Sequence, residues 1–396
     1  MRFSPLSLSA AALLATAASA SPVLSSSSSD AKLDKRAQFE KRTDDLVWQG
    51  NSSLPKILVY TDYATAASGS THGPTDTSAY GQISRNATEV LGAVPEVYDV
   101  AQIAIKYITG PAGNINTGSY DYVALSFAKY VDYALCHEGS DIDGAVFIHG
   151  TNLLEETAFL ADVTVSCSKP VVATGSMRPF TDIGYEGSAN IYSAFTLAVA
   201  PDAGGRGTMI AFNDRIVSAH WATKFHANAP DAFNAAEQGK LGMFVNHMPV
   251  FFNTPSLPTS KVVFPIQHVE ELPKVDILYV HRQHDIRLLN ASVGFGAQGV
   301  VFDGTGSGAI TRNSSVAADF VQQGIQIVVA TRTSTGMSVP GRTDSPPYAQ
   351  SGFLNAQQSR IVLQLAIANG YTMEDTVKLF EGQIRSSLGP AYDLAY

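Results

Sequence analysis

The sequence predicts an α/β fold, with a larger N-terminal domain built on a mostly parallel sheet and a smaller C-terminal α/β domain. Short, continuously apolar segments alternate with segments of helix length, which is typical of a parallel sheet in a layered α/β fold. A stretch rich in proline, serine and threonine at residues 253–259 interrupts this alternation, and the pattern then starts again. We therefore expect an N-terminal domain over residues 54–252, a linker over 253–272 and a C-terminal domain over 273–396.

The elements follow from these patterns in chain order. In the N-terminal part, each apolar strand runs into a polar, loop-forming sequence, and the predicted strands are 56–60, 144–148, 170–173 and 208–212. The helices predicted there are 88–91, 122–133 and 153–163. The C-terminal part predicts strands at 275–280, 299–302 and 325–330, and helices at 316–322, 356–368 and 373–380. Ligands of such sheets bind beyond the carboxyl ends of the strands, so functional residues are expected in the polar sequences that follow them.

Composition excludes several classes of protein. With 45% hydrophobic and 15% charged residues, the 396-residue chain is neither wholly disordered nor fibrous. The net charge of -9 and the lack of a basic patch argue against a nucleic-acid partner. No unbroken apolar run reaches about 18 residues, so no membrane-spanning helix is expected in the mature protein.

The N-terminus has the pattern of a secretory signal peptide over residues 1–20, with Arg2 before a small apolar run and Ala-Ser-Ala at 18–20. A serine-rich stretch and two dibasic pairs, at 35–36 and 41–42, indicate a pro-segment over 21–42. A buried core helix is the alternative, which the serine-rich stretch disfavours. Removal of residues 1–42 would take away six basic and three acidic residues and change the net charge from -9 to -12.

Two further features favour a protein that is secreted or held in the cell wall. Cys136 and Cys167 are the only cysteines, and one disulfide is expected in an oxidising compartment, although two buried free thiols are the alternative. Four N-x-[ST] sequons indicate a glycoprotein. They are Asn51, Asn86, Asn290 and Asn313.

Three side chains that follow predicted strands are candidates for catalysis. Thr65 lies in a loop of small residues, where a hydroxyl nucleophile can stand beside backbone N–H groups that stabilise an oxyanion; the alternative is an ordinary turn threonine. Thr151 follows the strand 144–148, and the next residue, Asn152, is expected to cap the following helix together with Glu155. Lys224 can act as a base if burial lowers its pKa, although most lysines are solvated.

Neither a metal nor a cofactor is expected. The nine histidines show no HExxH pattern and no close pairing with cysteine. The glycine-rich segment 304–308 lacks the lysine of a P-loop and the glycine spacing of a dinucleotide fingerprint.

Several of these segments together resemble the type II, secreted L-asparaginases of the asparaginase/glutaminase family. Residues 149–157 resemble HGTDTxEET of that family, residues 169–179 resemble KPVVxxGAMRP, and residues 213–224 resemble its ND…VTK segment. Residues 352–366 are similar to its SGTLNPxKAR helix. The resemblance covers nearly all of residues 54–396 and implies the two-domain asparaginase-like fold and hydrolysis of asparagine to aspartate and ammonia.

The resemblance also implies roles for single residues. Thr65 aligns with the nucleophilic threonine and Tyr80 with the tyrosine that assists it, while Thr151 and Lys224 align with the second threonine and the lysine of a Thr-Lys-Asp set. The two cysteines stand where secreted bacterial members carry a disulfide. Members are commonly homotetramers whose sites are completed by a neighbouring subunit. The positions that correspond to substrate-binding residues are Thr117 for the substrate carboxylate and, from the neighbouring subunit, Ser307 with Asp344 as the nearest acidic residue.

Two departures from the family pattern concern the substrate. The family loop TGGTIAG has glycines where this chain has Tyr63 and Ala64, and glycine permits a closer approach of the backbone. Asn152 replaces the aspartate that binds the substrate α-ammonium group. A charge-assisted hydrogen bond contributes about 1.5–3 kcal/mol, so affinity for a free amino acid would fall about 10- to 150-fold.

Two hypotheses follow, and a third is more general. The first is an active amidohydrolase that acts on asparagine or on a related amide lacking a free α-amino group. The second is a secreted asparaginase-like binding protein with impaired catalysis. The third is a different ligand-binding α/β protein that shares only the fold.

Overall fold

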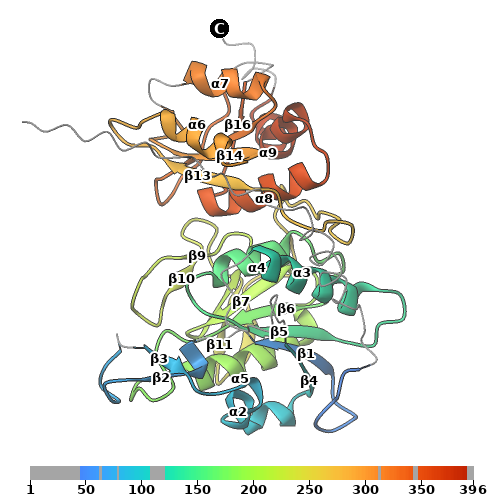
Figure 1. The fold of residues 1–396 in the computed structure, drawn as a ribbon. Coiled ribbons are helices and arrows are strands. Elements are labelled where there is room, and N and C mark those ends of the chain that lie inside the picture. Colours follow the sequence, from blue (N-terminus) through green and yellow to red (C-terminus); the bar gives the residue numbers. More distant parts are fainter. Residues whose placement is uncertain are drawn as a thin grey trace, which may run out of the picture. The chain divides into compact units, whose positions relative to one another are not determined.

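The computed structural model describes residues 45–61, 65–77, 80–107, 121–310, 314–341 and 347–389. The predicted signal peptide and pro-segment lie outside the described residues. Figure 1 shows a larger sheet formed by the first part of the chain and a smaller sheet formed by the last part. The predicted α/β fold with a mostly parallel larger sheet is confirmed.

The larger sheet has eight strands in the order β12-β11-β8-β7-β6-β5-β1-β4. Five of them are parallel: β4 (Gln102–Lys106), β1 (Lys56–Thr61), β5 (Gly144–Ile148), β6 (Val171–Thr174) and β7 (Thr208–Phe212). The other three continue the sheet in antiparallel fashion: β8 (Arg215–Ser218), β11 (Gly242–Val245) and β12 (Met248–Phe251). The central strands are buried on both faces, which explains why their sequences are continuously apolar.

Helices cover both faces of this sheet. Alternate strand residues such as Leu58 and Phe147 pack on α3 (Asp121–Cys136) and α4 (Leu154–Asp162). Their neighbours Ile57 and Val146 point to the opposite face, where they pack on α2 (Ala87–Gly92) and α5 (Gly187–Ala198). No helix in the described part of the chain is long and apolar enough to cross a membrane.

The smaller sheet is entirely parallel, in the order β13-β14-β15-β16. Its strands are β13 (Val275–Tyr279), β14 (Gly299–Gly304), β15 (Gln326–Thr331) and β16 (Ala349–Gln350). One face packs on α8 (Ala356–Ala368) and α9 (Met373–Leu388), and the other on α6 (Arg287–Gly294) and α7 (Ser314–Gln322). Helix α8 is capped by Asn355, whose side chain accepts a hydrogen bond from the backbone N–H of Gln358 (2.9 Å).

Two tight hairpins account for the antiparallel strands, which the sequence did not predict. Asn213 and Asp214 have φ angles of 48° and 60° and form the turn between β7 and β8. Asn246 and His247, with φ angles of 52° and 60°, form the turn between β11 and β12. Asparagine and aspartate tolerate this left-handed conformation, so the Asn-Asp pair of the third motif serves as a hairpin turn.

The remaining elements are short. Two two-stranded ribbons follow the strands of the larger sheet: β2 (Ser68–Ser70) with β3 (Tyr80–Ile83), and β9 (Thr223–Lys224) with β10 (Phe233–Asn234). Three 3₁₀ helices complete the described elements: η1 (Thr65–Ala67), η2 (Pro95–Asp99) and η4 (Pro201–Ala203).

The predicted linker, residues 253–272, contains no helix or strand but is packed against the protein. Phe264 and Ile266 are buried, and the backbone N–H of Phe264 donates to the carbonyl of Val163 (2.8 Å). Lys261 Nζ donates to Asp162 Oδ1 (2.8 Å) at the end of α4. The segment therefore contributes to the core next to α4.

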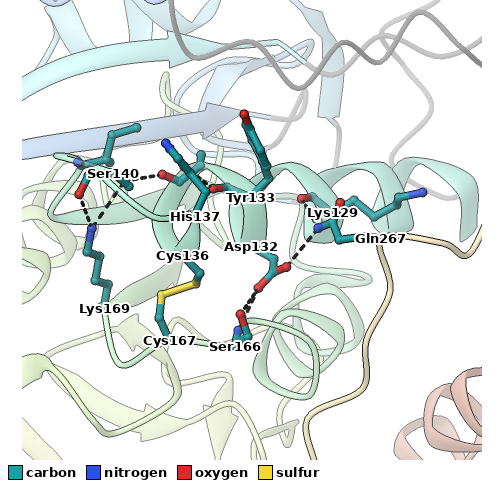
Figure 2. The surroundings of a disulfide bond; sticks show 12 residues. Lys129, Asp132, Tyr133, Cys136, His137, Ser140, Ser166, Cys167, Lys169 and Gln267 are labelled. Atoms are coloured by element: carbon teal, nitrogen blue, oxygen red, sulfur yellow. Dashed lines mark hydrogen bonds between the residues drawn. A yellow bond between two sulfur atoms is a disulfide. The ribbon is translucent and has the colours of Figure 1, made fainter.

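Figure 2 shows the disulfide between Cys136, at the end of α3, and Cys167, in the loop before β6. The Sγ atoms are 2.11 Å apart, in agreement with the predicted pairing. Close by, the Ser166 hydroxyl donates to Asp132 Oδ1 (2.7 Å) and Gln267 Nε2 donates to Asp132 Oδ2 (3.0 Å). The bond and these contacts join α3 to the loop before β6 and to the 253–272 segment.

Reduction of this disulfide should lower the free energy of unfolding by about 2–4 kcal/mol, because the cross-link restricts the unfolded chain. Urea denaturation with and without a thiol reductant measures the effect. In the control, Cys136→Ala/Cys167→Ala, the reductant should change nothing. Equal stability of oxidised and reduced wild type would show that the bond contributes nothing to the fold.

Candidate active site

The carboxyl ends of β1 and β5 lie side by side, because these strands are parallel neighbours with Thr61 opposite Ile148. Thr65 begins η1 four residues after β1 ends, and Thr151 follows β5 by three residues. Thr65 is half-buried and is followed by two buried alanines. Both predicted threonines thus lie within a few residues of the carboxyl ends of two neighbouring strands, the edge at which such sheets bind ligands.

Thr151 and Lys224 are in direct contact. Lys224 Nζ donates a hydrogen bond to Thr151 Oγ1 over 3.0 Å, although the two residues are 73 positions apart. Thr151 is only 7% exposed and Lys224 is half-buried. Burial lowers the pKa of Lys224, and the negative charge of Glu155 acts in the opposite direction. An amine with a lowered pKa next to a hydroxyl is suited to proton transfer.

Glu155, in the first turn of α4, holds the backbone at Lys224. Its Oε2 accepts a hydrogen bond from the backbone N–H of Lys224. Burial raises the pKa of Glu155, while the hydrogen bond from Lys224 and its positive charge oppose that rise. The strand β9 that carries Lys224 pairs with β10, where Phe233 is its partner.

The prediction that Asn152 and Glu155 cap the helix is wrong. Helix α4 begins at Leu154, its N-cap is Leu153 with φ of −127°, and no side chain caps it. Asn152 is exposed, and the Glu155 carboxylate accepts the backbone N–H of Lys224 instead. A partner distant in sequence has therefore replaced the local capping contact.

The loop that carries Thr151 is fixed from both sides. The buried His149 ring donates from Nδ1 to the carbonyl of Gly150 (2.8 Å), and its Nε2 lies 3.1 Å from the Thr157 hydroxyl. A Cβ at Gly175 would lie 2.4 Å from the carbonyl oxygen of His149, so only glycine permits this approach. The glycine of the second motif thus lets β6 pack against the Thr151 loop.

The residues directly after the second motif support the region that follows Thr65. The backbone N–H of Phe180 donates to the carbonyl of Ser68 (3.1 Å), and the backbone N–H of Ser70 donates to the Thr181 hydroxyl (2.8 Å). Arg178 Nη1 donates to the carbonyl of Gly184 (2.8 Å) and so closes its own loop. The contacts of Phe180 and Thr181 hold β2, which directly continues η1.

The other predicted site residues stand as follows. Tyr80 is the first residue of β3 and pairs with Ser70; of residues 80–83 only the backbone is described. Ser307 lies in the exposed turn after β14, where its carbonyl accepts a hydrogen bond from Val339 (3.0 Å). The residues that lie outside the described part of the chain are Thr117, Asp344, Tyr63 and Ala64.

Three of the four sequons are described, and all three asparagines are exposed: Asn51, Asn86 and Asn290. Asn86 also caps α2, because its Oδ1 accepts the backbone N–H of Glu89 (3.0 Å) and leaves its amide nitrogen out of that contact. Asn313 lies outside the described residues. Within the described residues, no group of three or more His, Cys, Asp or Glu side chains is arranged to hold a metal ion.

Comparison with known families matches two models in succession. "Asparaginase, N-terminal" matches residues 65–257, and "Glutaminase/Asparaginase C-terminal domain" matches residues 274–380. The chain belongs to the asparaginase family. Asparaginase-family membership makes it an amidohydrolase, and its two sheets are the two domains of that fold.

Asparaginases from other organisms are similar over most of the length. "L-asparaginase 2-3" of Saccharomyces cerevisiae is 37% identical over 340 residues, which cover 84% of this chain and 91% of the yeast protein. "L-asparaginase 2" of Bacillus subtilis is 35% identical over 325 residues, covering 79% and 83%. The crystal structure of a probable cytoplasmic L-asparaginase from Campylobacter jejuni superposes with a TM-score of 0.74 at 31% identity and covers 82% of this chain and 99% of that one.

Proposed function

We propose that this asparaginase-family chain is a secreted L-asparaginase that hydrolyses the side-chain amide of asparagine to aspartate and ammonia, with Thr65 as nucleophile. The observation that carries the proposal is the hydrogen bond from Lys224 Nζ to Thr151 Oγ1. It joins a partly desolvated amine to a buried hydroxyl in the segment after β5, and β5 is the parallel neighbour of β1, the strand that precedes Thr65.

The proposed reaction has two steps. Thr65 Oγ1 attacks the amide carbon, assisted by Tyr80, and the hydroxyl proton is passed to the amide nitrogen as the C–N bond breaks and ammonia leaves. Water then attacks the resulting ester, transfers a proton to Thr65 and releases aspartate. Thr151 and Lys224 serve proton transfer, because the neutral amine of Lys224 accepts a proton through the Thr151 hydroxyl that it contacts.

Three features support the secreted location. The N-terminal residues have the composition of a signal peptide followed by dibasic processing sites. The described sequon asparagines are exposed. The Cys136–Cys167 disulfide fits an oxidising compartment. Expression of the full-length chain tests this part of the proposal: N-terminal sequencing of the secreted product should find a start after residue 20 or residue 42, and deglycosylation should lower its mass.

Asn152, the exposed residue next to Thr151, gives a test of the substrate. Replacement Asn152→Asp restores a negative charge for the α-ammonium group and should lower KM for asparagine about 10- to 150-fold. Succinamate, which is asparagine without its α-amino group, should gain nothing. Ammonia release from both substrates measures the effect. If the substitution changes neither KM or changes both alike, Asn152 does not face the α-ammonium group.

We further propose that the enzyme is a homo-oligomer, a tetramer by resemblance, in which Ser307 and an acidic residue such as Asp344 complete the site of a neighbouring subunit. The exposed position of Ser307 in the turn after β14 is compatible with this role. Light scattering at several concentrations measures the assembly. A fully active monomer would contradict the proposal.

A further inference from the structure

We propose that Glu155 is a positioning residue, a role that rests on the function proposed above: its carboxylate holds the backbone of Lys224 where Nζ reaches Thr151, and its negative charge favours the protonated form of that amine. Glu155 would act through Lys224 and would not touch the substrate.

Glu155 and Thr151 both contact Lys224. Glu155 lies four residues after Thr151, so the carboxylate and the hydroxyl belong to one continuous segment leading into α4. Both bind Lys224: Glu155 accepts its backbone N–H, and Thr151 accepts a hydrogen bond from its Nζ (3.0 Å). The two contacts hold Lys224 at its backbone and at the end of its side chain. The distance between Nζ and the Thr151 hydroxyl therefore depends on the Glu155 carboxylate.

Apart from Glu155, Lys224 is held by a short two-stranded ribbon. Its strand β9 is two residues long and pairs with the equally short β10. Such a ribbon is only marginally stable by itself and needs support from neighbouring elements. Glu155 supplies that support from α4, one of the helices that cover the larger sheet.

Glu155 and Lys224 also influence each other's pKa. Burial lowers the pKa of Lys224, and the charge of Glu155 is the influence that raises it. In turn, burial raises the pKa of Glu155, against the hydrogen bonds from the Lys224 backbone and the Thr223 side chain and against the charge of Lys224. Of the other nearby charged groups, Arg360 and Asp121 act on the neighbouring carboxylate, Glu156. Removal of the Glu155 charge would leave the desolvation of Lys224 unopposed and lower its pKa further.

Glu156 provides a matched control. It is the next residue of α4, it is also half-buried, and burial likewise raises its pKa. The largest opposing influence on Glu156 is the charge of Arg360, in α8, whereas for Glu155 it is the contact with Lys224. A general effect of removing a half-buried carboxylate from α4 would therefore appear in both variants.

The test measures the ionisation of Lys224 without using catalysis. Trace acetylation of the purified protein over a range of pH, followed by mass spectrometry, gives the midpoint pH at which Lys224 becomes reactive. Glu155→Gln keeps an oxygen acceptor for the backbone N–H and removes the charge, so its midpoint should move to lower pH. Glu156→Gln should keep the wild-type midpoint. An unchanged midpoint in Glu155→Gln, or an equal shift in Glu156→Gln, would overturn the inference.

Kinetics supply the second readout. Glu155→Ala, which loses the acceptor as well, should lower kcat about 10²-fold with a smaller change in KM, because misplacement of a catalytic group costs rate more than binding. Glu155→Gln should keep more of the rate and should move the acid limb of its pH profile to lower pH. Wild-type kcat in Glu155→Ala would count against positioning. If Lys224 shows the shifted midpoint but the wild type releases no ammonia, the positioning role stands and the proposed function fails.

Discussion

Lys224→Met should lower kcat for asparagine about 10²- to 10⁴-fold, the range that general acid–base catalysis contributes. Methionine keeps an apolar side chain of similar length but removes the amine that lies 3.0 Å from Thr151 Oγ1. Lys224 is half-buried in a two-residue strand. The substitution leaves the backbone contacts of this strand in place, so the fold should be retained.

The matched control is Lys378→Met. Lys378 lies in α9, its side chain is 67% exposed, and it forms an ion pair with Glu374 (2.6 Å). This variant should keep wild-type kcat. Steady-state ammonia release and circular dichroism of both variants distinguish a catalytic loss from a folding defect. A Lys224→Met enzyme within a few-fold of wild type would remove Lys224 from the mechanism.

Asp162→Asn should destabilise the protein by about 3–5 kcal/mol, since it breaks a buried ion pair and leaves a buried charge uncompensated. Asp162 is 2% exposed at the end of α4. Its Oδ1 accepts hydrogen bonds from Lys261 Nζ and from the backbone N–H of Thr208, each 2.8 Å, and its Oδ2 lies 3.0 Å from His220 Nδ1. The carboxylate thereby joins α4, β7, the 253–272 segment and the loop that leads to Lys224.

Two comparisons sharpen this prediction, with urea denaturation as the measurement. The double variant Asp162→Asn/Lys261→Met should recover part of the lost stability, because it removes the stranded charge. Asp141→Asn breaks the exposed pair with Lys56 and should change stability by less than about 1 kcal/mol. Equal stability of wild type and Asp162→Asn would show that the buried pair is not needed.

The contribution of Asp162 should also depend on pH. Burial alone would raise the pKa of Asp162, but the hydrogen bond from His220 and the charge of Lys261 outweigh it, and the pKa is lowered from 3.8. A group whose pKa is lower in the folded state stabilises the fold above its unfolded value and loses that contribution as the pH falls through the folded value. The difference between wild type and the double variant should therefore be present at neutral pH and shrink below about pH 4.

Much of the fold could be predicted because long apolar strands carry an unambiguous pattern. The strand predictions at 144–148 and 208–212 coincide with β5 and β7, and the helix prediction at 356–368 coincides with α8. Helix α5 was missed because its sequence GSANIYSAFTLA mixes small and polar residues with apolar ones even at buried positions. Strands β11 and β12 were missed because they expose apolar side chains such as Val245 and Met248, which hides the usual alternation.

The capping pattern shows why local reasoning succeeds at one place and fails at another. Asparagine followed three residues later by glutamate forms a true capping box at Asn86 and Glu89. The same spacing at Asn152 and Glu155 does not, because Glu155 accepts the backbone N–H of Lys224, 69 residues away. The local sequence does not indicate that Lys224 competes for Glu155.

The candidate site was predictable only in part, for the same reason. The predicted strand ends drew attention to Thr65 and Thr151. The pairing of Thr151 with Lys224 came from the family resemblance and not from a local pattern. The partners of Asp162 lie 46, 58 and 99 residues along the chain, so the buried cluster emerges only from the tertiary structure. Gly175 belongs to the second motif and could be recognised there. The reason that the position needs glycine is the close approach of the His149 carbonyl, which the sequence does not show.

The most direct test is ammonia release by the purified protein, with asparagine, glutamine and succinamate as substrates and with Thr65→Ala as the comparison. The account predicts release from asparagine or succinamate that disappears in Thr65→Ala while the fold and the assembly of the variant remain those of wild type. Release that persists in Thr65→Ala would contradict the nucleophile. No release from any of the three amides by a folded protein would contradict the enzyme and favour a binding role.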